Sequence, residues 1–251
     1  MRFIFPLLVL LAASAFSEDA VKPETLGYKP VWSDEFNGTA LDAAKWSTSY
    51  APKVHPLGCN SEKQSYAPEN AVLRDGHLVL RAERKAREGM RFTSGMISSH
   101  DKFSREYGWF EAHMKLPKGK GMWPAFWMLP QAKTWPPELD IMEHKGRLPH
   151  RAFLTLHERQ ANTWRPKSTG REWDGPDFTE DFHTFALEWL PDGLRWYIDG
   201  IERHRWNGKA DFGPMYLIVN LAIGGDFDGD ADAATPFPGE MEIDYVRVFA
   251  K

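Results

Sequence analysis

The sequence predicts an all-β protein that folds as one sandwich or barrel, and three observations support this prediction. Apolar side chains recur with a period of two far more often than with the helical period of 3.6. Asp-Gly pairs at residues 75–76, 192–193 and 199–200 separate these runs, as hairpin turns require. The chain also carries 20 glycines and 18 prolines, which many short strands need in their turns. An α+β domain is the alternative that this pattern leaves open.

The first clear strands along the chain show strict alternation. Residues 77–82 place Leu78, Leu80 and Ala82 on one face of a strand. Residues 109–116 alternate in the same way between apolar and mostly polar side chains. Both runs therefore predict strands with one face toward a core.

The second half of the chain contains the strongest hairpin pattern. Residues 182–190 and 194–198 lie on either side of a Pro-Asp-Gly turn and predict two paired strands. Residues 216–223 are apolar except for Asn220, which predicts a strand buried on both faces. Helix is expected only in short stretches such as residues 41–46.

Length and composition exclude several classes of protein. The 251 residues suffice for one large domain, and 42% hydrophobic with 26% charged residues excludes disorder, collagen and coiled coil. With 31 basic and 35 acidic residues the net charge is −4, which argues against nucleic acid as a partner. The single cysteine, Cys59, cannot close an internal disulfide. The 11 tryptophans supply more flat apolar surface than a core needs.

The N-terminus has the pattern of a secretory signal peptide. Arg2 supplies the positive end, residues 3–12 are apolar, and residues 13–15 form an A-x-A cleavage pattern. We therefore predict a signal peptide over residues 1–17 and a secreted or periplasmic mature chain over residues 18–251. A membrane anchor is the rival interpretation, but the apolar run is short for a bilayer. After cleavage we expect a monomer with no membrane association.

Three carboxylates lie within six residues, interleaved with apolar side chains. On a strand, Glu138 and Asp140 point to one face because side chains alternate. Glu143 lies five positions from Glu138, so a regular strand aims it at the opposite face. One extra residue, a β-bulge near Ile141 and Met142, returns it to the same side. The three acids then line one strip of a sheet.

This arrangement suits the hydrolysis of a glycosidic bond. Like charges at close range raise the pKa of at least one acid, so one carboxyl stays protonated beside an ionised one. The ionised group attacks the anomeric carbon, and the protonated group gives its proton to the departing oxygen. A structural explanation stays open, because acids after prolines can also open a short helix or decorate an exposed strand.

Several motifs, in the right order, resemble glycoside hydrolase family 16. The run from Glu138 to Glu143 is similar to the E-x-D-x-x-E pattern of the family. The resemblance extends over residues 31–249 and favours the laminarinase-like branch. The other matching segments are Trp32-Ser-Asp-Glu35-Phe36, Asn60-Ser-Glu62-Lys-Gln64-Ser-Tyr66, and residues 118–129, 220–225 and 244–248.

The resemblance implies a single-domain β-jelly roll, concanavalin-like, built of two curved antiparallel sheets with a sugar-binding cleft. It also implies an endo-acting, retaining β-glycosidase that hydrolyses β-1,3 or mixed β-1,3/1,4 glucan such as laminarin through a covalent glycosyl-enzyme intermediate. By position in the motif, Glu138 is the nucleophile and Glu143 is the general acid and base. Asp140 lies between them and tunes Glu138.

The resemblance also implies residues that bind the polysaccharide substrate. Trp123 and Trp135 are subsite residues whose flat rings stack on sugars. His157 matches a histidine that faces the cleft from the next strand, and Asn60 lies in a matching loop. We expect Trp127 to pack in the core.

No cofactor is expected for catalysis, because the nine histidines show no metal-ligand spacing such as H-E-x-x-H. The resemblance implies a structural calcium ion on the convex side, held by Glu35, the Gly76 carbonyl and Asp244. The aspartates of residues 226–232 lack the terminal glutamate of an EF-hand and are interpreted as a solvated loop. His144 alternates away from the acids and is interpreted as structural.

Departures from the family pattern leave the substrate open. Phe153 and Trp109 stand where relatives often have histidine and arginine, and Pro137 replaces a glycine. An agarase, carrageenase or porphyranase activity on a marine galactan is therefore an alternative, as is a non-catalytic β-glucan-binding module. A sulfated galactan would favour added basic residues in the cleft. The arginines available for this are Arg105, Arg151, Arg159 and Arg165.

Overall fold

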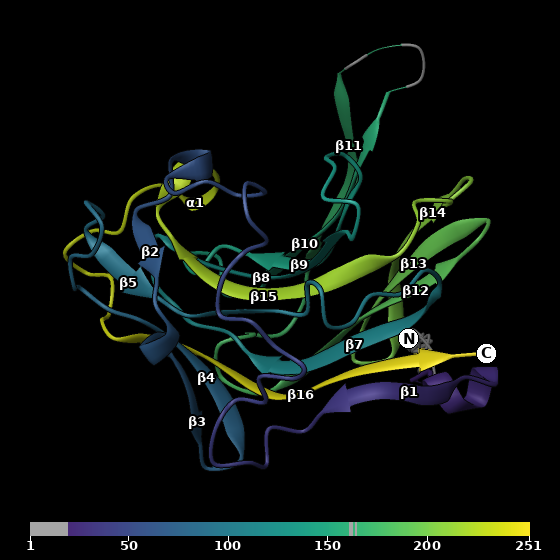
Figure 1. The fold of residues 1–251 in the computed structure, drawn as a ribbon, viewed down its shortest axis with the longest axis horizontal. Coiled ribbons are helices and arrows are strands. Elements are labelled where there is room, and N and C mark those ends of the chain that lie inside the picture. The colour runs from purple at the N-terminus through teal and green to yellow at the C-terminus, as the bar shows by residue number, and fades with distance from the viewer. Residues whose placement is uncertain (1–19, 161–162, 164) are drawn as a thin grey trace, which may run out of the picture.

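The computed structural model describes residues 20–160, 163 and 165–251 and packs them into two β-sheets (Figure 1). The predicted signal peptide, residues 1–17, lies outside the described residues. The fold is nearly all-β, so the predicted jelly-roll sandwich is confirmed and the α+β alternative is wrong. Within the described residues, no helix has the length and apolar character needed to cross a bilayer.

The larger sheet has eight strands in the part of the chain that is described, and all of its pairings are antiparallel. Seven strands follow one another across the sheet, and β1 also pairs with β16. In spatial order they are β14 (Ile201–Asn207), β13 (Gly193–Ile198), β12 (His183–Leu190), β7 (Gly108–Lys115), β16 (Gly239–Ala250), β4 (His77–Ala82) and β3 (Ala71–Arg74), with β1 at Lys29–Asp34.

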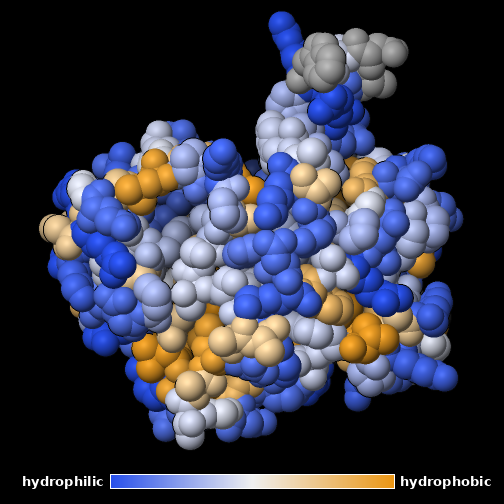
Figure 2. Space-filling model, in the orientation of Figure 1, coloured by the Kyte–Doolittle hydropathy of each residue, from blue (hydrophilic) through white to orange (hydrophobic). Residues whose placement is uncertain are grey.

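The second sheet has six described strands and carries the acidic cluster on its central strand, β9. Its order is β11 (Pro166–Asp174), β10 (Arg151–Arg159), β9 (Glu138–His144), β8 (Met122–Pro130), β15 (Met215–Ile223) and β6 (Met96–Ser98). Figure 1 shows β10 and β11 rising from this sheet as a projecting hairpin. Most of β11 is exposed, and hydrophilic side chains dominate this projection in Figure 2.

The remaining elements are short. β2 (Gln64–Tyr66) and β5 (Phe92–Ser94) form a small parallel pair beside the main sheets. Single 3₁₀ turns occur at Pro23–Leu26, Cys59–Ser61 and Pro68–Asn70, and α1 is one turn at Gly225–Asp228.

The main core lies between the two sheets. Phe110 and Leu187 of the larger sheet meet Phe126 and Leu217 of the smaller one, all fully buried. Burying such a side chain contributes about 1.5–3 kcal/mol, so this layer dominates the stability of the sandwich. Alternation then forces the neighbouring residues of the six-stranded sheet onto its outer face.

Most of the strand predictions are confirmed, and one helical prediction is wrong. The hairpin forms as β12 and β13, and β15 is buried at every position. Residues 41–46 form a turn instead of a helix. Here Asp42 accepts a hydrogen bond from the Ala44 amide, and buried Trp46 donates to Asp34 from its indole nitrogen. These contacts fix a turn that local propensity cannot anticipate.

Candidate active site

A β-bulge in β9 brings the three acids to one face. On β8, Phe126 pairs with Met142, while the next residue, Trp127, pairs with Asp140. Ile141 is therefore the extra residue, and the register of β9 against β10 shifts at the same place. The bulge predicted from the spacing is confirmed.

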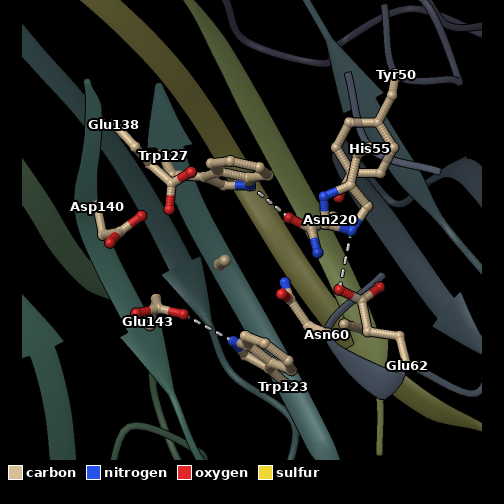
Figure 3. Close-up of a pocket in the computed structure, with 12 residues that line it drawn as sticks. Tyr50, His55, Asn60, Glu62, Trp123, Trp127, Glu138, Asp140, Glu143 and Asn220 are labelled. Atoms are coloured by element: carbon tan, nitrogen blue, oxygen red, sulfur yellow. Dashed lines mark hydrogen bonds and ion pairs between the residues drawn. The ribbon is translucent and has the colours of Figure 1, made fainter. Parts of the chain in front are cut away.

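The bulge separates an acidic face from an apolar one. Leu139, Ile141 and Met142 pack into the core, and the carboxyl groups turn to the other side of the sheet (Figure 3). His144 is fully buried, contacts the Arg151 carbonyl oxygen at 2.7 Å, and has its pKa lowered by burial to about 4. This placement agrees with its interpretation as structural.

The larger sheet also anchors the bulge in β9. The indole nitrogen of Trp196, which is fully buried on β13, donates to the backbone oxygen of Asp140 at 2.9 Å. A strand in one sheet thus fixes the backbone beneath the acids in the other.

Two tryptophans hold the outer acids. The Trp123 indole nitrogen donates to Glu143 Oε1 at 2.9 Å, and the Trp135 indole nitrogen donates to Glu138 Oε2 at 2.9 Å. Each bond occupies one carboxyl oxygen and leaves the other available for chemistry. Trp135 is 51% exposed, so its ring is open to a ligand.

His157 approaches the acids from β10. Its Nε2 lies 3.0 Å from Asp140 Oδ2 and 3.7 Å from Glu138 Oε1. Its Nδ1 hydrogen-bonds the Ser168 hydroxyl at 2.8 Å, which fixes the orientation of the ring. The imidazole therefore faces the two carboxyls nearest the start of β9.

Burial makes the charges of this cluster costly. It raises the pKa of Glu143 to about 8, and the negative charge of Asp140 adds to the effect. Burial, followed by the charge of Asp140, also raises the pKa of Glu138 to about 8, and burial raises that of Asp140 to about 8. His157 and an indole N–H act in the opposite direction on both Glu138 and Glu143. Because three like charges cannot share this space, the cluster holds at least one proton near neutral pH, and the contacts of Glu138 with His157 and the Trp135 N–H favour this acid as an anion.

Glu138 and Glu143 line an open cleft of about 690 Å³. A smaller recess of about 70 Å³ at its floor brings all three acids opposite the loop that carries Asn60 (Figure 3). The larger cleft is lined by Val54, His55, Cys59, Asn60, Trp123, Trp127, Leu129, Trp135, Glu138, Glu143, Thr155, His157, Asp226 and Phe227. The fold thus brings together all seven residues for which we predicted catalytic or substrate-binding roles.

Several residues of the recess had no role in the sequence analysis. Buried Glu62 accepts one hydrogen bond from the Gln64 amide and contacts His55 Nε2 at 3.0 Å. Asn220 accepts a bond from the Trp127 indole nitrogen at 2.6 Å and donates to the Tyr66 hydroxyl at 2.9 Å. Asn220 could have been found, since it is the one polar residue in an otherwise apolar strand. No local pattern singles out His55.

Trp127 and the aspartate-rich segment need correction. Trp127 is 8% exposed and packs in a hydrophobic cluster as expected, but it also lines the cleft. Asp228 does not belong to a solvated loop, because it is buried and accepts bonds from Arg147 Nε and the Gly121 amide, each at 2.6 Å. It holds α1 beside the cleft.

The residues expected for calcium do not fit an ion as they are placed. Glu35 forms a bidentate ion pair with Arg247, in which the closer contact joins Arg247 Nη2 and Glu35 Oε2 at 2.6 Å. Asp244 lies 2.9 Å from His113 Nδ1 and 3.9 Å from His77 Nε2. A calcium ion would have to displace Arg247 from Glu35 and the two histidines from Asp244, so these residues as placed do not form a calcium site.

A bulged strand that presents one buried and two half-buried acids in an open cleft of a jelly roll defines a glycoside hydrolase. Residues 60–247 match the model described as Glycosyl hydrolases family 16. The chain belongs to this family.

Similar proteins agree with this assignment. The chain is 35% identical to a β-glucanase of Rhodothermus marinus, over 99% of this chain and 94% of that protein. It is 36% identical to a glucan endo-1,3-β-glucosidase of Niallia circulans, but it spans only 38% of the length of that protein. The laminarinase catalytic domain of Thermotoga maritima superposes with a TM-score of 0.81 at 34% identity, covering 89% of this chain and 98% of that one.

Proposed function

We propose that this chain is an endo-acting, retaining β-glycosidase that hydrolyses β-1,3 or mixed β-1,3/1,4 glucan such as laminarin. The observation that carries the proposal is the bulged strand that holds Glu138, Asp140 and Glu143 together on the floor of an open cleft. An open cleft admits an internal stretch of polymer, which an endo-acting enzyme must bind. The relatives named as β-glucanases and laminarinases support the glucan class.

The first chemical step uses the two outer acids in different protonation states. Glu143 keeps a proton at neutral pH and donates it to the glycosidic oxygen as the bond breaks. Glu138 attacks the anomeric carbon and forms the glycosyl ester. The N–H donors of Trp123 and Trp135 fix both carboxyls, so little reorganisation is needed during the step.

The second step follows from a change in charge. Once Glu138 is an ester it is neutral, and the pKa of Glu143 falls because fewer negative charges remain nearby. Glu143 then removes a proton from water, which attacks the anomeric carbon and releases the sugar with its configuration retained. Two carboxyls supply nucleophile, acid and base, so we propose no cofactor for catalysis.

The polarity of the cleft supports a neutral glucan over a sulfated galactan. Its lining, as far as the chain is described, includes no lysine or arginine. Arg151 instead pairs with Glu172 and Asp174. The presence of all three acids favours an enzyme over a non-catalytic glucan-binding module.

Export and oligomeric state belong to the same proposal. The signal-like residues 1–17 support a secreted or periplasmic enzyme that acts on polysaccharide outside the cytoplasm, and we propose that it acts as a monomer. Nucleic acid is not proposed as a partner, because the net charge of −4 disfavours phosphate.

The test is reducing-end release from a polysaccharide panel of laminarin, lichenan, barley β-glucan, agarose and κ-carrageenan. Glu138→Gln is the matched blank, because it keeps the shape of the side chain and removes the nucleophile. The proposal is supported if the parent releases reducing ends from laminarin or lichenan and the variant does so at least roughly 10³-fold more slowly. Release from agarose or carrageenan alone would keep the mechanism and overturn the substrate.

A further inference from the structure

Three side chains direct one donor atom each toward a common point in the cleft. His157 pairs directly with Glu138 across β9 and β10, so the two side chains lie side by side on the outer face. His157 Nε2 lies 3.0 Å from Asp140 Oδ2 and 3.7 Å from Glu138 Oε1, and the three donor atoms lie within 4.8 Å of one another.

One of these atoms has no hydrogen-bond partner. Asp140 Oδ2 is buried without a hydrogen bond, and the residue as a whole is 2% exposed. His157 Nε2 is close enough but does not point at this oxygen in hydrogen-bonding geometry. A buried carboxylate oxygen without a donor is unfavourable, and a bound proton, a water or a metal cation can each satisfy it.

The imidazole is already oriented as a metal ligand. His157 Nδ1 is occupied by the Ser168 hydroxyl at 2.8 Å, which leaves Nε2 to face the two carboxyls. Histidine ligands of metals are usually fixed in this way by a hydrogen bond to the second ring nitrogen.

The distances suit a small transition-metal ion. Zinc binds histidine nitrogen and carboxylate oxygen at about 2.0–2.2 Å, so tetrahedral ligand atoms lie roughly 3.3 Å apart. The observed contacts of 3.0 and 3.7 Å lie on either side of that value. One nitrogen and two oxygens also suit zinc or copper, whereas calcium requires six to eight oxygens, on the usual count.

We propose that a divalent transition-metal ion, zinc above all, binds Glu138, Asp140 and His157 and reversibly inhibits the enzyme. Three protein ligands leave the fourth position open to the cleft. The bound ion occupies Glu138 and Asp140, and it therefore competes with the sugar for the nucleophile. The inhibitory effect rests on the proposed hydrolase activity, whereas the binding site does not.

The test is calorimetric titration of zinc chloride into the chelator-treated mature chain, with cobalt(II) absorption as a second readout. One zinc ion per chain is expected to bind. His157→Ala should weaken binding at least tenfold, and Ser168→Ala by roughly 10–100-fold if orientation matters as at other metal sites. His150→Ala is the matched control, because this exposed histidine lies outside the three-ligand cluster.

In parallel, zinc should raise the apparent KM for laminarin without changing kcat, and a chelator should restore activity. Absence of binding, or binding unchanged in His157→Ala, would overturn the site. Binding without any hydrolase activity would uphold the site and refute the proposed function. Hydrolase activity without zinc binding would uphold the proposed function and refute the metal site.

Discussion

Glu143→Gln is predicted to inactivate the enzyme and to stabilise it, by an amount that grows with pH. The amide keeps the shape of the side chain and can still accept the Trp123 hydrogen bond. It also removes a carboxyl whose pKa is raised from 4.5 to about 8, first by burial and then by the charge of Asp140. The folded chain therefore binds this proton more tightly than the unfolded chain.

The sign and size of the effect follow from this difference. Below pH 4.5 the group is protonated in both states and adds no difference, whereas between 4.5 and about 8 the unfolded chain ionises first and the free energy of unfolding falls. At about 1.4 kcal/mol per pKa unit the upper bound is near 5 kcal/mol. Because neighbouring acids share the effect, we expect about 2–3 kcal/mol at pH 8, or roughly 4–12 °C in Tm for a domain of this size.

The assay is thermal unfolding of both proteins from pH 4 to pH 8.5, beside turnover of laminarin. Glu180→Gln is the control, because this glutamate is 69% exposed and its ion pair with Lys118 is equally exposed. The Tm difference between Glu143→Gln and the parent should be near zero at pH 4 and should widen as pH rises. An equal difference at both ends of the range, or a destabilised variant at pH 8, would refute the reasoning.

Three further substitutions test the supports of the site. Trp196→Phe removes the donor to the Asp140 carbonyl. The free energy of unfolding in urea should fall by about 1–3 kcal/mol, and kcat should fall as well. Unchanged values would show that this bond does not hold the bulge. Gly225→Ala places a Cβ 2.7 Å from the Asn60 carbonyl oxygen at a φ of 83°, so KM for laminarin should rise; an unchanged KM would contradict a role for this loop. Asp228→Ala leaves the buried Gly121 amide without its acceptor and removes the partner of the exposed Arg147, so Tm should fall; an unchanged Tm would show that these bonds do not hold α1.

Local spacing was sufficient to predict the strands and the catalytic face. The period of two in apolar side chains predicted β4, β7, β12 and β13, because one side of each strand faces the core. The five-residue offset between Glu138 and Glu143 required a bulge if the acids were to share a face, and β9 has that bulge.

The helix expected over residues 41–46 shows where local pattern fails. So short a segment cannot hold a helix by propensity alone. Its conformation is set instead by Trp46, which is buried and donates a hydrogen bond to Asp34 of β1. The burial of Asp228 has the same cause, since its partners come from residues 121 and 147.

The sequence by itself determined the fold class, the family resemblance and the identity of the three acids, because each is encoded in short-range periodicity and spacing. Only the tertiary structure placed His157 against Asp140, Trp196 beneath the bulge and His55 with Glu62 across the recess. Those contacts join different elements of the fold. Their distances depend on how strands pair and how sheets pack, which no local pattern specifies.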